Sequence, residues 1–570
     1  MSDYVELHCH SAYSFLDGAS LPEELAMQAE RLGYSALALT DHDGLYGSLE
    51  FARQMEGRGL QPITGAEVTL EDGSHLTLLA ETPTGYANLC RLLSAAHLGS
   101  ERLHPRLPRS QLERHAEGLI LLSGCRHGEI ARALDAGDTA AAEAAARRYR
   151  EWFGRENCFL ELQQTLTRGD TARIRALLRL AHQLELPVVA TGNVHYHRRE
   201  RHRLQDVLVA IRHRTTLDDS HAVRRANSEA YLKPPAEMAR LFAERPEAVL
   251  ATRRIAERCQ AFTLTRDLGY RFPDFHGEAA DSLLAEICRA ALAERYASES
   301  AAIRAEAKRR LETELEIVRH HRLSGFFLVY RDLLELARAI AARLRRGQAR
   351  GRFDLPPGRG RGSSVASIIC YLIGLSPVDP VKARLSLGRF LNKELASVPD
   401  IDLDFPRDIR EELIRAVHHH YGEAHVAMVA SFPTYRLRSA VREIGKALGL
   451  PAAEVDRLAR LAEPRDAAAV EAELRRLPGF EQALTARPWQ LLAELARELA
   501  GFPRHLSQHV GGMIISSRPL VEIVPLERSR MEGRQICQWD KDSCDDARFI
   551  KVDFLALGSL SAVEECLNLI

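Results

Sequence analysis

The sequence predicts a multidomain protein of mixed α/β and α+β class, and three observations lead to this prediction. The chain has 570 residues, which is too long for one hydrophobic core and corresponds to about three or four domains. Hydrophobic residues make up 46% of it and charged residues 27%, as is typical of globular proteins. Short apolar runs alternate with helical patterns in the first part, whereas later segments are mainly helical.

Up to about Glu200, the pattern predicts a barrel of strands and helices. Helical patterns such as Leu21 to Leu32 separate the apolar runs, and such alternation is typical of parallel βα units. The predicted strands are Val5 to His8, Ala36 to Thr40, Pro62 to Gly65, Leu76 to Ala80, Leu119 to Ser123, Phe159 to Leu162 and Pro187 to Thr191.

Beyond the barrel, the composition indicates helices and a second mixed region. From about His213 to Arg346 the chain is rich in Ala, Arg and Glu. A Gly/Pro-rich break at Leu355 to Gly362 precedes the mixed region, and a helical segment from about Arg436 to Gly501 separates that region from a β-rich part. We therefore expect one domain to be interrupted by an inserted helical unit.

Charge, cysteines and hydropathy narrow the class of protein. The net charge is −1, so binding of a polyanion must rest on local clusters of basic residues. The ten cysteines form no CxxC pair, which argues against a disulfide framework or a zinc ribbon. Because the sequence shows no signal-peptide pattern and no apolar run long enough to span a bilayer, we expect a cytoplasmic protein without a membrane role.

Metal-ligating side chains gather at the ends of the predicted strands. His8 and His10 are two residues apart on a strand, so both imidazoles face one side and can bind one metal ion. A single histidine is more often a core or surface residue, but the repeated placement at strand ends favours a metal site. The other candidates are Asp17, His42, Glu67, His75, Cys125 and His195. This mixture of donors suits Zn²⁺ or Mn²⁺, and Glu67 is suited to bridging two ions.

Two acidic strands predict a second metal site. Acids alternate with apolar residues from 399 to 405, so Asp400, Asp402 and Asp404 share one face of a strand. Far downstream, Asp553 lies alone in another apolar run. If the two strands lie side by side, they form a two-magnesium site of the kind that nucleotidyl transfer needs. Structural calcium binding or simple solvent exposure is the alternative for either strand alone.

A loop rich in glycine and serine precedes the first acidic strand, at residues 358–364. Its glycines let the backbone approach an anion, and Ser363 can donate a hydroxyl group. A helix predicted over Val365 to Leu375 would begin with free N–H groups. The pattern favours a binding site for a triphosphate.

The first cluster resembles the PHP (polymerase and histidinol phosphatase) family over roughly the first 200 residues. The resemblance places metal ligands at His8, His10, Asp17, His42, Glu67, His75, Cys125, Asn193 and His195. Active members usually carry Asp at the position of Asn193, and a neutral amide is a weaker ligand than a carboxylate. We therefore hypothesise a metal-loaded domain with weak or no hydrolysis.

The later motifs resemble the alpha subunit of bacterial DNA polymerase III and its error-prone relatives, the C family of DNA polymerases. The matching motifs are Gly-Arg-Gly-Ser-Ser at 360–364, Gly-Arg-Phe-Leu-Asn at 388–392, the acidic run at 399–405, Arg504 with His-Val-Gly-Gly at 509–512, and Lys-Val-Asp-Phe-Leu at 551–555. The resemblance assigns the catalytic metal ligands to Asp400, Asp402 and Asp553. It assigns nucleotide binding to Gly362, Ser363, Ser364, Arg389, Arg442 and Lys551. A salt-bridged structural role is the alternative for each of the last three.

The resemblance implies a PHP barrel followed by a nucleotidyltransferase palm similar to that of DNA polymerase beta, with an inserted helical thumb. The implied boundaries are 1–210 for the PHP domain, 211–280 for a helical connector, 281–432 and 511–560 for the two parts of the palm, 433–510 for the thumb and 561–570 for the start of the fingers. The implied function is DNA-directed DNA polymerisation in replication or error-prone lesion bypass.

The implied cofactors are Mg²⁺ at the palm and Zn²⁺ or Mn²⁺ at the PHP site. The implied partners are primer-template DNA, dNTPs and, through regions absent from this sequence, a sliding clamp and other replication or translesion subunits. Phe432 to Arg436 favours the error-prone branch. A PHP-type phosphoesterase or 3′–5′ exonuclease remains an alternative, as does a non-catalytic DNA-binding subunit without fingers. Three convergent acids argue against the last reading, because a scaffold has no physical need for them.

Overall fold

The computed structural model describes residues 4–270, 279–344, 359–388, 390–392, 394, 401–463, 466–480, 482–556 and 558–570. The chain divides into two compact units. Unit 1 consists of Met1–Leu268, Ser431–Ser507 and Val521–Glu527, and unit 2 consists of Gly269–Ala430, Gln508–Leu520 and Arg528–Ile570.

A six-stranded sheet in the order β1-β2-β3-β4-β5-β6 forms the centre of unit 1. Its strands are β1 (Ala36–Leu39), β2 (Gln61–Thr69), β3 (His75–Ala80), β4 (Leu119–Leu122), β5 (Cys158–Gln163) and β6 (Val188–Thr191). A further segment connects the two edges of this sheet, because Glu6 bridges Leu37 of β1 and Cys9 bridges Val194 beyond β6. The sheet therefore curls into a barrel, as the sequence predicts.

The strand directions correct the prediction that all βα units are parallel. β1–β2, β4–β5 and β5–β6 are parallel pairs, but β3 runs antiparallel to both β2 and β4. A short turn with Gly73 at a positive φ of 76° joins β2 to β3, and a hairpin connection of this length forces antiparallel pairing.

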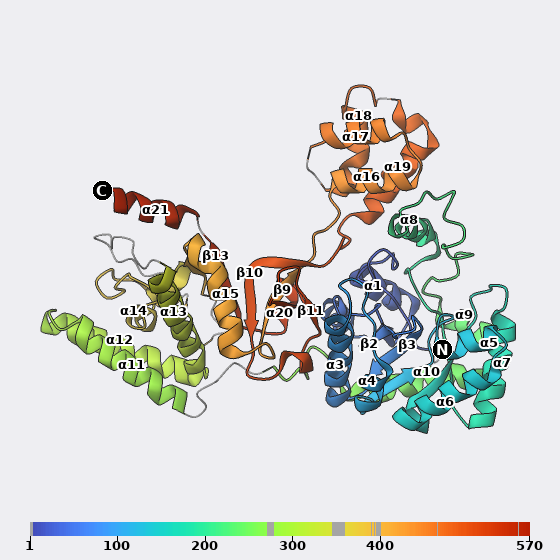
Figure 1. Ribbon diagram of the computed structural model, residues 1–570, viewed down its shortest axis with the longest axis horizontal. Coiled ribbons are helices and arrows are strands. Elements are labelled where there is room, and N and C mark those ends of the chain that lie inside the picture. Colours follow the sequence, from blue (N-terminus) through green and yellow to red (C-terminus); the bar gives the residue numbers. More distant parts are fainter. Residues whose placement is uncertain are drawn as a thin grey trace. The chain divides into compact units, whose positions relative to one another are not determined.

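Helices surround this sheet (Figure 1). They are α1 (Pro22–Leu32), α2 (Ser48–Glu56), α3 (Pro83–Gly99), α4 (Arg109–Arg114), α5 (Glu129–Asp135), α6 (Thr139–Phe153), α7 (Asp170–Leu184), α9 (Pro235–Leu241) and α10 (Pro246–Arg258), whereas α8 (His202–Arg212) packs on other helices of unit 1. Local sequence fixes their ends: α1 starts with Pro22 in its first turn and ends at Gly33, whose φ of 75° is left-handed. The apolar face of α10, with Ala251 and Ile255, shares a core with the strands.

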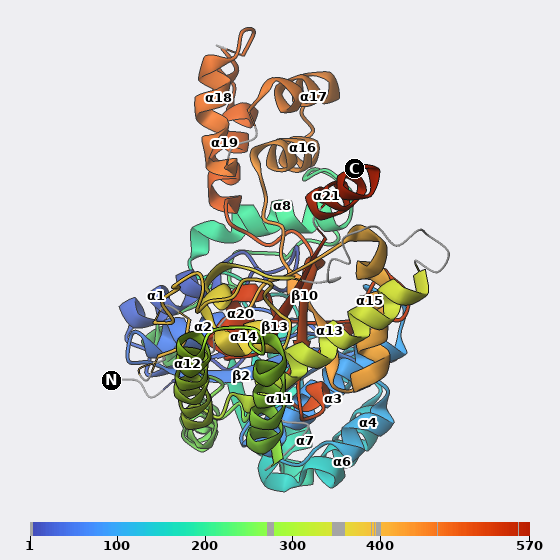
Figure 2. The same cartoon turned by 90° about the vertical axis from the view of Figure 1, so that its left-hand side faces the viewer.

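Four more helices of unit 1 form a bundle, shown in orange beside α8 in Figures 1 and 2. They are α16 (Leu437–Ala447), α17 (Ala452–Leu461), α18 (Val470–Arg476) and α19 (Arg487–Leu499). Leu437 and Ile444 of α16 and Leu499 of α19 lie in one buried core with Leu204 and Val207 of α8. The bundle and α8 are therefore held together by apolar packing.

Unit 2 contains most of a seven-stranded sheet in the order β11-β12-β9-β10-β13-β8-β7, in which two residues of β11, Leu526 and Glu527, belong to unit 1. Its strands are β7 (Arg359–Gly360), β8 (Leu403–Phe405), β9 (Val426–Ser431), β10 (Ser507–Ile515), β11 (Leu526–Arg528), β12 (Gln535–Cys537) and β13 (Lys551–Ala556). β9 and β10 are neighbours in this sheet, although α16 to α19 separate them in the sequence. The predicted helical insertion into the second mixed region is therefore confirmed.

The helices of unit 2 are α11 (Ala280–Arg295), α12 (Ala301–His320), α13 (Ser324–Leu344), α14 (Ile368–Leu372), α15 (Arg407–Tyr421), α20 (Lys541–Asp546) and α21 (Gly558–Leu569). The structure corrects the prediction of a helix over Val365 to Leu375. A 3₁₀ turn at Gly362–Ala366 comes first, and the helix α14 starts only after Ser367, because this residue is extended and its side chain caps the Cys370 amide.

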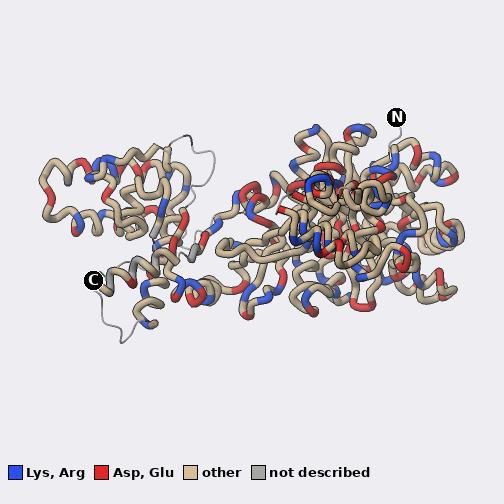
Figure 3. The backbone as a smooth tube through the Cα atoms, turned by 90° about the horizontal axis from the view of Figure 1, so that it is seen from above, with Lys and Arg blue, Asp and Glu red and all other residues tan. Residues whose placement is uncertain are grey.

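Basic and acidic residues alternate along most of the chain in Figure 3, in agreement with a net charge of −1. Among the helices of the described residues, none combines the length and the apolarity needed to cross a bilayer.

Candidate metal and nucleotide sites

The ligands predicted for the amino-terminal site converge on the buried carboxylate of Glu67 in β2. Its Oε1 lies 3.5 Å from His8 Nε2 and 3.4 Å from His75 Nδ1. Its Oε2 lies 3.1 Å from His42 Nε2 and 3.6 Å from His10 Nε2. Four histidines that are far apart in the sequence therefore surround one carboxylate.

Three further predicted ligands extend this cluster. Asp17 Oδ2 lies 3.4 Å from His42 Nε2 and 3.8 Å from His195 Nε2. On the other side, Cys125 Sγ lies 3.7 Å from His75 Nδ1. The structure thus brings these side chains into one continuous set of nitrogen, oxygen and sulfur donors, which we call the Glu67 cluster.

The donors of the Glu67 cluster fit a divalent cation. His8 Nε2, His10 Nε2 and Glu67 Oε1 are buried without a hydrogen-bond partner, which is rare for buried polar atoms unless an ion or water serves them. Ligand atoms lie within 4.8 Å of one another in the triplets His10-His42-His195, His8-His10-Glu67 and His42-Glu67-His75. Burial opposes ionisation of Glu67, but the neighbouring histidines hold its pKa well below the usual value, so its carboxylate is an anion.

Glu161 orients His8, a role that the sequence reasoning missed. Its Oε1 lies 2.6 Å from His8 Nδ1, which leaves Nε2 of that imidazole facing Glu67. Burial alone would lower the pKa of His8, but Glu161 and Glu67 raise it to about 10. The sequence did contain a signal for Glu161, because this residue is an acid within an apolar strand, the same feature that singled out Asp553.

Asn193 lies at the edge of the Glu67 cluster with a positive φ of 48°. Its Oδ1 is buried without a hydrogen-bond partner. Nearby, Arg225 lies within hydrogen-bond distance of His195 Nε2, and Arg212 lies 3.4 Å from Asp17 Oδ2. Burial and then Arg225 lower the pKa of His195 to about 3. Two arginines therefore bring positive charge next to the predicted ligands His195 and Asp17, and both line the same cavity as Asn193.

The cluster opens into a cavity of about 600 Å³. Basic side chains are frequent among its lining residues, namely His104, Arg106, Arg126, His127, Arg212, His213, Arg224 and Arg225. Ligating side chains in the wall and cationic groups around them suit an anion bound next to a metal ion.

The predicted acids of unit 2 meet on adjacent strands. β8 and β13 pair in parallel, with Leu403 opposite Phe554. Asp402 directly precedes β8, and this register, continued by one residue, sets Asp402 opposite Asp553. The buried side chain of Leu403 points to the other face, as the predicted alternation requires. Asp400 lies outside the described residues.

Arg361 spans two acids of this site. Its Nη2 lies 3.2 Å from Asp402 Oδ2, and its Nε lies 3.3 Å from Asp404 Oδ1. Burial raises the pKa of Asp404, although the Arg361 charge opposes this. The guanidinium therefore partly neutralises a group of acids that would otherwise repel one another.

Strand β10 approaches Asp553 closely, which explains two glycines of the His-Val-Gly-Gly motif. A Cβ atom on Gly512 would lie 3.0 Å from Asp553 Oδ1 and 2.7 Å from His509 Nδ1, and one on Gly511 would lie 2.5 Å from the Phe554 carbonyl oxygen. His509 Nδ1 instead accepts the Gly512 N–H at 2.7 Å and lies 3.7 Å from Asp553 Oδ1.

The glycine-serine loop leads from β7 to the 3₁₀ turn. Gly362 has a φ of 74°, and both Gly362 and Ser363 are exposed. Ser364 is buried and donates to the Arg361 carbonyl oxygen at 2.9 Å. The first two residues are thus accessible to an anion, while Ser364 stabilises the turn.

The structure also corrects the prediction of free N–H groups behind this loop. The amides of Ile368 and Ile369 at the start of α14 donate to the carboxylate of Glu314 at 3.0 and 3.3 Å. They are therefore already satisfied within the protein and not free for a phosphate.

The remaining predicted contacts form ion pairs. Lys551 Nζ lies 2.5 Å from Asp545 Oδ1. Arg442 belongs to α16 of unit 1, and its Nε lies 3.4 Å from Asp456 Oδ1. Arg389 lies outside the described residues. The structure thus shows a salt bridge for two of the three basic candidates.

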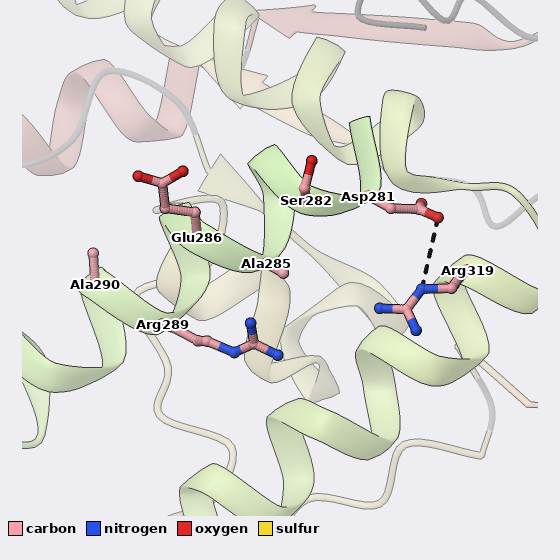
Figure 4. A pocket seen from close by; sticks show the side chains of 7 residues that line it. All are labelled: Asp281, Ser282, Ala285, Glu286, Arg289, Ala290 and Arg319. Atoms are coloured by element: carbon pink, nitrogen blue, oxygen red, sulfur yellow. Dashed lines mark ion pairs between the residues drawn. The ribbon is translucent and has the colours of Figure 1, made fainter. Parts of the chain in front are cut away.

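A separate hollow of about 780 Å³ lies on α11 and α12 (Figure 4). Within it, Arg319 Nε lies 3.6 Å from Asp281 Oδ2, and Arg289 pairs with Glu312 at 2.9 Å. The hollow contains none of the predicted site residues.

A barrel with a cluster of metal-ligating side chains and a mixed sheet with acids on adjacent strands define a two-part protein with two candidate metal sites. Both parts match family models: residues 6–165 match the PHP domain, and residues 282–556 match the bacterial DNA polymerase III alpha NTPase domain. The chain therefore combines a PHP domain with a domain of the bacterial DNA polymerase III alpha type.

Curated relatives are similar to this chain along its whole length. Proteins named error-prone DNA polymerase from Symbiobacterium thermophilum, Pseudomonas aeruginosa and Mycobacterium tuberculosis (strain H37Rv) are 40%, 38% and 38% identical to it. Each alignment covers 100% of this chain but only 52%, 52% and 50% of the relative. The chain thus spans about half the length of the relatives it matches. A solved amidohydrolase from Chromobacterium violaceum is 17% identical over 34% of this chain and 87% of its own, with a TM-score of 0.23, which does not establish a shared fold.

Proposed function

We propose that this chain carries the catalytic palm of an error-prone DNA-directed DNA polymerase. The observation that supports this most directly is the register of β8 and β13, which brings Asp402 and Asp553 to adjacent positions beside Arg361. The names of the relatives point to the same activity. The substrates proposed are primer-template DNA and dNTPs in lesion-bypass synthesis in the cytoplasm, with a sliding clamp as a partner.

Each element of the palm has a role in this proposal. Asp402 and Asp553, together with Asp400, hold Mg²⁺. When bound, the metal would lower the pKa of the primer 3′ hydroxyl and neutralise charge on the triphosphate. Arg361 adds a positive charge next to the loop at 362–363, where the phosphates bind. The pairing of Gly512 with Asp553 keeps β10 close to this acid, and His509 Nδ1 lies 3.7 Å from Asp553 Oδ1.

Substitution of either acid tests the proposal. In the full-length polymerase, Asp402→Ala and Asp553→Ala should each lower the rate of nucleotide incorporation by at least about 10³-fold, because the metal stabilises the charge of the transition state. Duplex affinity should stay within about twofold, since phosphate contacts elsewhere dominate it. Primer extension and DNA-binding titrations measure the two effects. Extension at the wild-type rate by either variant would refute the assignment.

We further propose that the Glu67 cluster binds Zn²⁺ or Mn²⁺. A metal-dependent phosphoesterase or 3′–5′ exonuclease is the second candidate function, favoured by the basic lining of the cavity. Asn193 and the two arginines favour weak hydrolysis. Glu67→Ala should remove any metal-dependent hydrolysis of a 3′ end while Asp553→Ala leaves it unchanged. Hydrolysis lost in Asp553→Ala but kept in Glu67→Ala would exclude the cluster as its site.

A further inference from the structure

Two side chains of α12, Arg310 and Glu314, contact the backbone that follows the glycine-serine loop. They lie one helical turn apart, with Arg310 Nε 3.3 Å from Glu314 Oε1. Glu314 is fully buried. Neither residue belongs to the Glu67 cluster or to the acids of the palm, so another role must explain a buried carboxylate paired with a half-buried arginine at this place.

Glu314 fixes the start of α14. Its Oε1 accepts the Ile368 N–H at 3.0 Å, and its Oε2 accepts the Ser367 hydroxyl at 2.7 Å and the Ile369 N–H at 3.3 Å. Hydrogen bonds to an ionised carboxylate are roughly twice as strong as neutral ones. The carboxylate therefore anchors the chain directly after the turn that contains Ser364.

Arg310 fixes two further points of the backbone. One of its amino groups donates to the carbonyl oxygen of Ala366, the last residue of the 3₁₀ turn. The other donates to the Leu385 carbonyl oxygen at 2.7 Å. Leu385 lies shortly before the Gly-Arg-Phe-Leu-Asn motif at 388–392. One guanidinium thus connects the end of the first predicted nucleotide motif to the approach of the second.

The other end of the loop is anchored separately. The Gly360 amide donates to the Leu375 carbonyl oxygen at 2.7 Å, and β7 pairs with β8. Gly362 and Ser363 are exposed between these anchors. An exposed loop centre with rigid ends is suited to bind an anion without a large loss of conformational entropy.

We propose that Arg310 and Glu314 are positioning residues that preorganise Gly362 and Ser363 for the triphosphate of a nucleotide. The identity of this ligand rests on the proposed polymerase function, whereas the place of action rests on the contacts. Neither side chain touches the triphosphate. Both act through the backbone at 366–369 and at Leu385, so their loss should weaken nucleotide binding more than the chemical step.

Titration of the 570-residue chain with Mg·dATP tests this inference. Glu314→Gln and Arg310→Lys should each raise the Kd for Mg·dATP about tenfold, because each weakens the charge-assisted bonds that hold the loop. Glu312→Gln is the matched control: Glu312 lies on the same helix, 45% exposed, and pairs with Arg289 of the hollow in Figure 4. The control should bind Mg·dATP within about twofold of the wild type.

Kinetics of the full-length polymerase separate positioning from a general structural role. Both variants should raise the KM for dATP about tenfold while kcat stays within about threefold, whereas loss of folded protein would lower kcat and leave KM unchanged. The use of two variants keeps the test valid if one of them does not fold.

Three results would overturn the inference: a wild-type chain that does not bind Mg·dATP, variants that bind it as tightly as Glu312→Gln, or an unchanged KM. The polymerase proposal fails in a different way. If Mg·dATP binds and both variants weaken it, but the wild-type full-length protein does not extend primers, the positioning role stands and the proposed activity is wrong.

Discussion

At the scale of single residues, Glu161 shows how a side chain outside the ligand set can control a metal site. Its 2.6 Å contact with His8 Nδ1 fixes which nitrogen of that imidazole faces Glu67. Removal of such a partner typically lowers metal affinity about 10–100-fold. We expect Glu161→Gln to weaken Zn²⁺ binding by this factor in a competition titration with a chromophoric chelator. Glu156→Gln, at a side chain that is 87% exposed, serves as the control, and equal affinities in both variants would contradict the assigned role.

Asn193 leads to a second prediction at this scale. Its buried Oδ1 has no hydrogen-bond partner, so a carboxylate at the same place would offer an anionic ligand, at the loss of the 3.4 Å hydrogen bond from Asn193 Nδ2 to Gln163 Oε1. We expect Asn193→Asp to increase the number of Zn²⁺ or Mn²⁺ ions retained per chain, measured by elemental analysis after gel filtration.

In the Asn193→Asp background, Arg225→Ala should further increase the number of metal ions retained per chain, since it removes a positive charge beside His195. Asn157→Asp, away from the cavity, is the control for added charge. An unchanged metal content in the double variant would show that neither residue limits it.

At the scale of elements, the sequence predicted the strands of the barrel well because their apolar runs are short and bounded by turns. It could not predict that β3 is antiparallel, since periodicity carries no information on strand direction. Asp402 was predicted from the alternation of acids with apolar residues, and Asp553 was predicted as a single acid in an apolar run. Glu314 was invisible, because an acid in an Ala- and Glu-rich helix gives no signal until the fold brings the start of α14 to it.

A buried histidine of the helix α15 leads to a prediction of how folding stability depends on pH. His418 is 4% exposed, and neither of its ring nitrogens has a hydrogen-bond partner. Burial and then Arg534 lower its pKa to about 4, whereas the unfolded chain has a value near 6.5. The folded state therefore disfavours the proton, and stability is lost as the pH falls below about 6.5 towards 4. At pH 5 the loss is about 2 kcal/mol.

The loss of stability at pH 5 should disappear in His418→Leu. It should persist in His419→Gln, because His419 is exposed on the same helix. Urea unfolding at pH 7 and pH 5 measures it. With Trp152 and Trp489 replaced by Phe, the buried Trp539 reports on unit 2 alone. An equal pH dependence in the wild type and His418→Leu would show that His418 is not the titrating group.

At the scale of the whole molecule, the helices α16 to α19 are inserted between strands of unit 2 but belong to unit 1. Sequence order alone assigns them to the domain that they interrupt. Their placement depends instead on which apolar surfaces complement each other, and the core shared with α8 shows the outcome. The bundle therefore depends for its stability on a helix more than 200 residues earlier in the chain.

This dependence is testable through Val207 of α8, which is fully buried in the shared core. Val207→Asp places an unpaired charge there, which costs about 3 kcal/mol or more. Because α16 and α19 pack on the same core, we expect their amides to exchange with deuterium at least about tenfold faster. Leu250→Asp, at an α10 residue that is 50% exposed, should leave this exchange unchanged. If Val207→Asp accelerates exchange in α8 but not in α16 and α19, the bundle is stable by its own packing and the shared core contributes nothing to it.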